Sequence, residues 1–179
     1  ADGVNSVVRR ALWGAWPRCA PMGMGLVTDL PAGALRPEAS DVMTQSMPRI
    51  YFGEAVWGYG WVFPKGECVS IGVGGLIGRN GDFRALLRGL VERCCAPGSF
   101  DAARVEGHRL PCGCLVRPAA RGRALLIGDA AGLVEPVTGE GIAPAMESAL
   151  LAAEAVGDAL ARGRPERAAR AYQALLRQR

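Results

Sequence analysis

The 179-residue sequence is poor in the residues that build metal and disulfide sites. It has a single histidine, His108, and its cysteines form neither a CxxC pair nor the spacing of a zinc finger. The six cysteines are Cys19, Cys68, Cys94, Cys95, Cys112 and Cys114. We therefore expect no metal site and no disulfide framework, and reduced thiols in a cytoplasmic protein.

Long hydrophobic runs are also absent. No apolar stretch reaches the roughly 18 residues needed to cross a bilayer, and no secretory leader opens the chain, so any membrane contact is expected to be peripheral. The net charge of +4 comes from scattered arginines rather than from a basic block, which argues against a nucleic-acid partner. Half of the residues are hydrophobic, which is enough for the core of one ordinary domain.

The sequence contains no dinucleotide-binding loop of the GxGxxG type. The stretch GVGGLIG at 72–78 comes close, but its glycines follow a GxGxxxG spacing and the next helix begins only after Asn80 and Gly81. We interpret Gly72 and Gly74 as strand glycines that allow the backbone to be approached closely.

The first half of the chain predicts short elements separated by turn residues. Asn5 or Ser6 is expected to cap a short helix that runs through Leu12. The stretches GLVTDL at 25–30 and PRIYFG at 48–53 predict strands.

A β-hairpin is predicted where YGWVF and CVSIGV flank the turn residues 64–67. Tyr59, Trp61 and Phe63 are two residues apart, so their rings project from one face of the sheet. This aromatic face is either core beneath a helix or the wall of a pocket, and the residues alone leave both open.

The stretch GRALLIGDAAGLVEPVTGEGIAPAMESA, residues 122–149, places an acid after an apolar run and then opens a helix with glycines. We interpret ALLIG as a strand of a parallel sheet, buried on both faces and ended by Asp129. Ligands bind at the carboxyl ends of such strands, and a carboxylate there suits ribose or ribityl hydroxyls. The alternative is a plain strand, turn and helix with an acid cap.

The helix after this strand is expected to offer free amides and the positive end of its dipole around residues 138–142, where an electron-rich ring would be stabilised. One of its faces is apolar and is expected to pack closely on the sheet. That face consists of Ile142, Ala145, Met146, Ala149, Leu150, Ala153 and Val156.

Two of these stretches resemble motifs of the FAD-dependent oxidoreductases related to p-hydroxybenzoate hydroxylase. GDAAGLVEPVTGEGIAPAMESA resembles their second flavin-binding motif, with Asp129 as the acid that holds the ribityl chain and the 138–142 amides on the pyrimidine side of the flavin. ADGVNSVVRR resembles their DG motif, with Asp2, Gly3, Ser6 and Arg9 matching. The cofactor-binding residues that the resemblance implies are Asp2, Gly3, Arg9, Gly128, Asp129, Ala130, Pro136, Thr138, Gly139, Glu140, Gly141 and Ile142.

The hairpin narrows the resemblance to the geranylgeranyl reductase branch, because Tyr59, Trp61, Phe63 and Pro64 match its YxWxFP pattern. The resemblance implies an α/β fold in which a partial Rossmann-like FAD-binding domain, residues 1–20 and 111–179, carries an inserted antiparallel substrate-binding sheet, residues 21–110. Tyr59, Trp61 and Phe63 would then bind a hydrophobic isoprenoid chain.

The implied activity is reduction of carbon-carbon double bonds of isoprenoid chains by reduced FAD, with NADPH or ferredoxin as the electron donor. The sequence offers no convincing catalytic proton donor. An FAD-dependent aromatic monooxygenase or a halogenase shares the flavin motifs and is the alternative enzyme, although Phe63 stands where halogenases have isoleucine. A truncated, non-catalytic remnant is the other alternative. Because the GxGxxG unit is absent, we expect a fragment that holds FAD weakly and is inactive alone.

Overall fold

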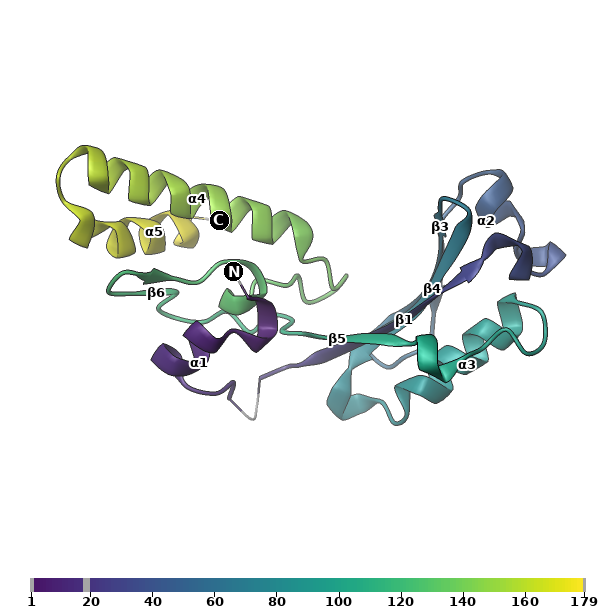
Figure 1. The fold of residues 1–179 in the computed structure, drawn as a ribbon. Coiled ribbons are helices and arrows are strands. Elements are labelled where there is room, and N and C mark those ends of the chain that lie inside the picture. The colour runs from purple at the N-terminus through teal and green to yellow at the C-terminus, as the bar shows by residue number, and fades with distance from the viewer. Residues whose placement is uncertain (1, 18–19, 179) are drawn as a thin grey trace. The chain divides into compact units, whose positions relative to one another are not determined.

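The computed structural model describes residues 2–17 and 20–178, which divide into two compact units (Figure 1). Unit 1 consists of Ala1–Pro21 and Leu110–Arg179, and unit 2 is Met22–Arg109. Each boundary lies one residue from the domain limit expected from the sequence. An antiparallel sheet inserted between two helix-rich pieces is the mixed α/β fold that the sequence predicts.

Unit 2 is built on a five-stranded sheet with the order β2-β3-β4-β1-β5, in which β4 pairs with both β1 and β3 in antiparallel fashion. The strands are β1 (Gly23–Pro31), β2 (Arg49–Phe52), β3 (Tyr59–Lys65), β4 (Cys68–Leu76) and β5 (Glu106–Leu110). The α-helices are α2 (Asp41–Thr44) and α3 (Phe83–Cys94), and the 3₁₀ turns are η2 (Ala32–Ala34), η3 (Pro37–Ala39), η4 (Ile77–Arg79) and η5 (Ala102–Arg104).

Helix α3 covers one face of this sheet and forms the core of unit 2. The side chain of Asp82 accepts a hydrogen bond from the Arg84 amide at 2.8 Å and so caps the helix, which fixes where it begins. Leucine and valine side chains of α3 are fully buried with the valines and isoleucine of β3 and β4. Cys94 and Cys95 are buried at its end, whereas Cys19 lies outside the described residues.

The aromatic face of β3 lies on the side of the sheet that α3 does not cover. Gly60 faces the helix, since a Cβ atom there would lie 2.8 Å from the Leu90 side chain. Tyr59, Trp61 and Phe63 therefore point the opposite way, with neighbouring ring centroids 6.1 and 6.2 Å apart. The alternative that these rings are core beneath a helix is wrong for α3, the helix that packs on this sheet.

Trp61 lies flat on strand β4. Its cross-strand partner is Gly72, and a Cβ atom at Gly72 would lie 2.0 Å from the indole Cζ2 atom. The ring covers the glycine, which is itself buried. The close approach expected at Gly72 is thus made by a side chain of the same sheet.

Unit 1 joins an N-terminal helix to a helical pair that packs on a small hairpin. Its elements are η1 (Gly3–Asn5), α1 (Val7–Trp13), β6 (Ala120–Arg121), β7 (Ala124–Leu125), η6 (Gly128–Ala131), α4 (Ile142–Ala161), η7 (Pro165–Arg167) and α5 (Ala168–Arg177). Figure 1 shows α5 lying along α4. The fully buried Tyr172 of α5 donates its hydroxyl to the Leu126 carbonyl at 2.6 Å, and burial raises the pKa of Tyr172 to about 12.

The expectation that ALLIG forms a strand of a parallel sheet is wrong. Only Ala124–Leu125 is a strand, and it pairs with β6 in antiparallel fashion. The described residues of unit 1 offer no neighbouring strand of the same direction, which a parallel pairing requires. Extended backbone ends at Gly128, whose φ is 53°, so Asp129 lies in the 3₁₀ turn η6 and not at the end of a strand.

The prediction of which side of α4 faces inward is also wrong. Ile142, Met146 and Leu150 are 76, 64 and 71% exposed. The helix instead buries small residues, Ser148, Ala155 and Ala159. They face inward because α5 and the turn η6 approach α4 closely, and only short side chains fit there.

We predict that Gly72→Ala destabilises the protein while Gly74→Ala does not. A methyl group at Gly72 overlaps the Trp61 indole, and forcing it in costs about 1–3 kcal/mol of unfolding free energy. A methyl group at Gly74 would have its nearest neighbour, also an atom of Trp61, at 3.6 Å, which is an ordinary contact. That change should stay within about 0.5 kcal/mol.

Urea unfolding measures both variants. If the clash is the cause, adding Trp61→Ala to Gly72→Ala should recover part of the lost stability. Strict additivity of the two changes would contradict this explanation.

Candidate functional site

The two predicted flavin motifs meet in unit 1, where η1 packs against η6. In the N-terminal motif, Ser6 caps α1 by accepting a hydrogen bond from the Arg9 amide at 3.0 Å. Asp2 accepts one from the Val7 amide at 2.9 Å. Hydrogen bonding, first with the Ser6 side chain, holds the pKa of Asp2 below its usual value. Asp2 and Ser6 therefore shape the turn that carries Gly3.

Arg9 is the buried cation of this motif. It is only 4% exposed, its guanidinium lies 4.0 Å from the centroid of the Trp16 ring, and burial lowers its pKa. Its Nε atom has no hydrogen-bond partner among the described residues. Arg9 is therefore buried inside unit 1 and does not lie on its surface.

The carboxylate of Asp129 lies beside the first turn of α4. A Cβ atom at Gly141 would come within 3.3 Å of its Oδ1 atom, so only a glycine leaves the space between them open. The predicted acid and the predicted helix start are therefore adjacent, although the acid reaches this place from a 3₁₀ turn.

An open hollow of about 580 Å³ surrounds this carboxylate. Five of the predicted cofactor-binding residues line it, namely Asp129, Gly139, Glu140, Gly141 and Ile142. Leu110, Val134, Ala145 and Met146 supply its apolar part. The hollow thus combines two carboxylates, those of Asp129 and Glu140, with a helix N-terminus and apolar walls.

The other seven predicted residues do not line the hollow, and Ala130 and Pro136 are two of them. Ala130 is 2% exposed and packs in a small core with Leu126 and Ala131. Pro136 belongs to the loop before α4 and lies against Gly113, where a Cβ atom would come within 3.4 Å of the proline Cβ atom. Both shape the backbone near the site without lining it.

Most of the amides expected to face a ligand are already used inside the loop. The Glu135 carboxylate accepts from the Val137 and Thr138 amides at 2.9 and 2.6 Å and from the Thr138 hydroxyl at 2.8 Å. Gly139 donates to the Glu135 carbonyl at 3.0 Å. The expectation of free amides is therefore wrong for Thr138 and Gly139, because Glu135 closes the loop into a turn.

Glu140 completes this arrangement at the start of α4. Its amide donates to the Thr138 hydroxyl at 3.2 Å, and its Oε1 atom accepts from the Ala143 amide at 2.8 Å. Within the described part of the chain, the amides of Gly141 and Ile142 have no hydrogen-bond acceptor. These two donors are what α4, a helix of 20 residues, offers to a ligand in the hollow.

Sequence reasoning missed two residues of the aromatic face in unit 2. Ile50 and Phe52 of β2 lie directly opposite Trp61 and Tyr59 across the sheet, so they share the face of those rings. They are 52 and 84% exposed. The signal was present in RIYF, where Ile50 and Phe52 alternate with the inward-facing Tyr51.

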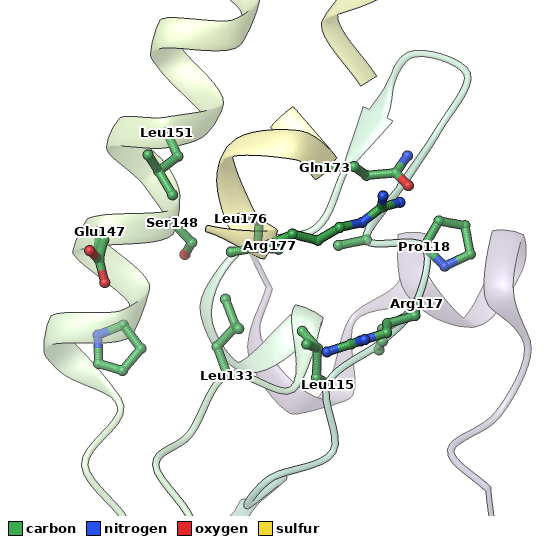
Figure 2. A pocket seen from close by; sticks show the side chains of 13 residues that line it. Leu115, Arg117, Pro118, Leu133, Glu147, Ser148, Leu151, Gln173, Leu176 and Arg177 are labelled. Carbon is green, nitrogen blue, oxygen red and sulfur yellow. The ribbon is translucent and has the colours of Figure 1, made fainter. Parts of the chain in front are cut away.

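A second pocket, of about 510 Å³, lies on the other side of α4 (Figure 2). Glu147, Ser148 and Leu151 line it from α4, and Figure 2 shows Leu176 and Arg177 reaching it from α5. None of the predicted cofactor-binding residues lines this pocket.

The structure also bears on metal binding and on membrane insertion. Among residues 2–17 and 20–178, no three His, Cys, Asp or Glu side chains are gathered as ligands of a metal ion. Within the same residues, no helix has both the length and the apolar character needed to span a bilayer.

The geometry of the hollow fits a ligand that carries hydroxyl groups next to an electron-rich ring. The Asp129 carboxylate can accept from hydroxyls, and the two free amides can donate to ring carbonyl or nitrogen atoms at the positive end of α4. The ribityl chain and the pyrimidine side of a flavin have this chemistry.

The chain is similar to several known reductases, although no family model matches it. It is 34% identical over 163 residues to a menaquinone reductase from Mycolicibacterium smegmatis, covering 86% of this chain and 39% of that protein. It is 35% identical over 122 residues to a digeranylgeranylglycerophospholipid reductase from Methanococcus vannielii, covering 63 and 30%. The chain thus spans less than half the length of these curated relatives.

A solved structure shares the fold. A geranylgeranyl bacteriochlorophyll reductase-like protein from Thermoplasma acidophilum superposes with a TM-score of 0.71 at 24% identity, over 89% of this chain and 40% of the other. The match supports the mixed α/β architecture across both units.

We predict that Glu135→Gln removes an acid-dependent part of the stability of unit 1. The Thr138 amide and hydroxyl hold the pKa of Glu135 below its usual value of 4.5, so its ionised form is favoured by folding. This stabilisation is present above pH 4.5 and is lost as the pH falls through the lowered pKa.

Urea unfolding should show the wild type more stable than Glu135→Gln at pH 7, with the difference closing as the pH falls below 4.5, the usual pKa of this side chain. Glu92→Gln in unit 2 controls for removal of a carboxylate. A difference that persists at low pH would contradict the interpretation.

Proposed function

We propose that the chain belongs to the geranylgeranyl reductase family of FAD-dependent oxidoreductases, as its similarity to the reductases named above supports, and that it holds the flavin half of FAD in an enzyme that reduces isoprenoid double bonds. The observation that carries the proposal is the Asp129 carboxylate beside the open first turn of α4. Reduced FAD, when bound, supplies the hydride for such a reduction.

The residues of the hollow have separate tasks in this proposal. Asp129 accepts hydrogen bonds from ribityl hydroxyls and fixes the cofactor along the turn η6. The Gly141 and Ile142 amides, with the positive end of α4, face the pyrimidine edge, where negative charge gathers on reduction. Val134 and Ala145 exclude water from the ring.

The proposed substrate is an isoprenoid chain, bound by the aromatic face of unit 2. Tyr59, Trp61 and Phe63 turn away from the core and, with Ile50 and Phe52, form an apolar surface on two neighbouring strands of one sheet. The names of both curated relatives refer to molecules that carry isoprenoid chains. A long apolar chain gains stability by covering such a surface.

The electron donor and the location in the cell are proposed on the family resemblance. NADPH or ferredoxin would reduce the flavin in the cytoplasm. Because an isoprenoid substrate partitions into lipid, the protein would collect it by peripheral contact with a membrane.

We predict that Asp129→Ala weakens flavin binding by about 1–3 kcal/mol, because ribityl hydroxyls lose a charged acceptor. The chain contains no GxGxxG loop, so riboflavin, which lacks the pyrophosphate and adenosine, should bind it about as weakly as FAD does, within roughly threefold. Flavin fluorescence titration of the purified chain measures both ligands.

Asp158→Ala is the matched control, since Asp158 lies near the far end of the same helix and bonds Arg162. It should leave both dissociation constants unchanged. If Asp129→Ala binds riboflavin as tightly as the wild type does, Asp129 is only a structural residue of the turn. FAD bound tightly enough to survive dialysis would show that the adenosine half is also recognised.

We predict that Trp61→Ala impairs long substrates selectively. Removing a buried indole contact costs about 2–3 kcal/mol, so kcat/KM on a long polyprenyl substrate should fall roughly 30- to 150-fold. A short prenyl analogue that does not reach the ring should change little. The assay uses a fusion of this chain with the remaining segments of a curated relative.

Val62→Ala serves as the control, because Val62 is the fully buried neighbour of Trp61 on the opposite face of β3. That change should lower stability and affect both substrates equally. Equal losses for Trp61→Ala on long and short substrates would argue that the ring is structural. Oxygen-dependent hydroxylation of an aromatic ring without alkene reduction would favour the monooxygenase alternative.

A further inference from the structure

Ser148 is a buried hydroxyl that joins the turn carrying Asp129 to helix α4. It is 1% exposed. Its Oγ atom accepts a hydrogen bond from the Gly128 amide at 3.0 Å and donates one to the Ala145 carbonyl at 3.0 Å. A serine within a helix commonly makes only the second of these bonds, which is local. The first spans 20 residues of sequence and reaches the residue immediately before Asp129.

The contact leaves Gly128 no room to move. With a φ of 53°, Gly128 turns its Cα toward α4, and a Cβ atom there would lie 2.9 Å from the Cβ atom of Ala145. The buried Gly128 amide therefore faces the helix directly, and the Ser148 hydroxyl is the acceptor within reach. Without this hydroxyl, a buried N–H group would lose its partner, which is costly.

The same helix carries the other half of the flavin site. Ala145 and Ser148 follow Gly141 and Ile142 by one to two turns, and the Ala145 amide itself donates to the Gly141 carbonyl at 3.1 Å. The bond to Gly128 thus fixes the backbone that precedes the carboxylate to the helix that supplies the amides.

Resting on the flavin-binding function proposed above, we infer that Ser148 is a positioning residue for the cofactor. Ser148 acts through its hydrogen bond to Gly128. This bond fixes the distance between the Asp129 carboxylate and the Gly141 and Ile142 amides. The groups that bind the ribityl chain and the ring are therefore held in one rigid arrangement. Ser148 itself lines the pocket of Figure 2, on the other side of α4, and does not line the flavin hollow.

The experiment compares Ser148→Ala with Ser148→Thr. Threonine keeps the hydroxyl and adds one methyl group. Hydrogen exchange of the ligand-free chain should show the Gly128 amide exchanging about tenfold faster or more in Ser148→Ala, with Ser148→Thr near the wild type. Riboflavin titration should show the dissociation constant raised about tenfold in Ser148→Ala and changed less than roughly threefold in Ser148→Thr.

Ala155→Gly is the control for a loss of helix stability. Ala155 is 2% exposed and lies two turns further along α4, so this change destabilises the same helix without touching Gly128. It should leave riboflavin affinity, compared at a temperature where all variants are folded, close to the wild type.

The outcomes separate this inference from the function on which it rests. Unchanged exchange at Gly128 in Ser148→Ala overturns the positioning role whether or not flavin binds. Equal affinity losses in Ser148→Ala and Ala155→Gly overturn it as well, because they show a stability effect. A wild-type chain that binds no riboflavin overturns the proposed function and with it the cofactor role, whereas the exchange result still decides whether Ser148 holds the turn.

Discussion

Close approach between the Gly128 turn and helix α4 is the contact on which unit 1 depends. Gly128 lies against Ala145, and a side chain on either partner larger than the one present would push them apart. Such proximity is possible because the inward side of α4 consists of alanines and a serine. It also buries an amide that needs an acceptor, and Ser148 provides one. Packing and hydrogen bonding therefore require the same small residues.

The need of every buried amide for an acceptor explains why the hollow beside Asp129 has few donors rather than many. A loop that enters a helix exposes a run of amides, each of which must find an acceptor. Glu135 takes those of Val137 and Thr138, and Glu140 takes that of Ala143. The donors that remain are at Gly141 and Ile142. Fixed donors discriminate between ligands better than a disordered row of amides does, because each fixed donor has one direction.

The elements with strong local signals were predictable. The period-two spacing of Tyr59, Trp61 and Phe63 indicates one sheet face, and Ser6 marks a helix start that the structure confirms. The same spacing did not tell which face α3 covers, because that depends on contacts between residues far apart in the sequence, such as Gly60 with Leu90. Spacing within β3 also carries no information on its partner, so Ile50 was missed.

The errors in unit 1 have a common physical cause. An apolar run such as ALLIG shows that a segment is buried, but the direction of a strand is set by its neighbour, which here is the antiparallel β6. Helix α4 carries apolar residues on most of its circumference, so hydrophobicity does not select the inward side. Size does: the side that meets another backbone closely must hold Ser148 and Ala155, while Ile142 and Leu150 lie outside.

In unit 2, small residues likewise decide what can pack closely, here on the face of a sheet. On β4, valines and an isoleucine face α3, and Gly72 and Gly74 face the other way. The glycines give the Trp61 indole a flat surface on which to lie, so the ring presents its outer side without rising from the sheet. Had β4 alternated valine with another β-branched residue, as strands commonly do, Trp61 would stand upright and the face would be ridged. A smooth apolar surface suits a flexible chain that has no polar group to be recognised, since contact area is then the main source of affinity.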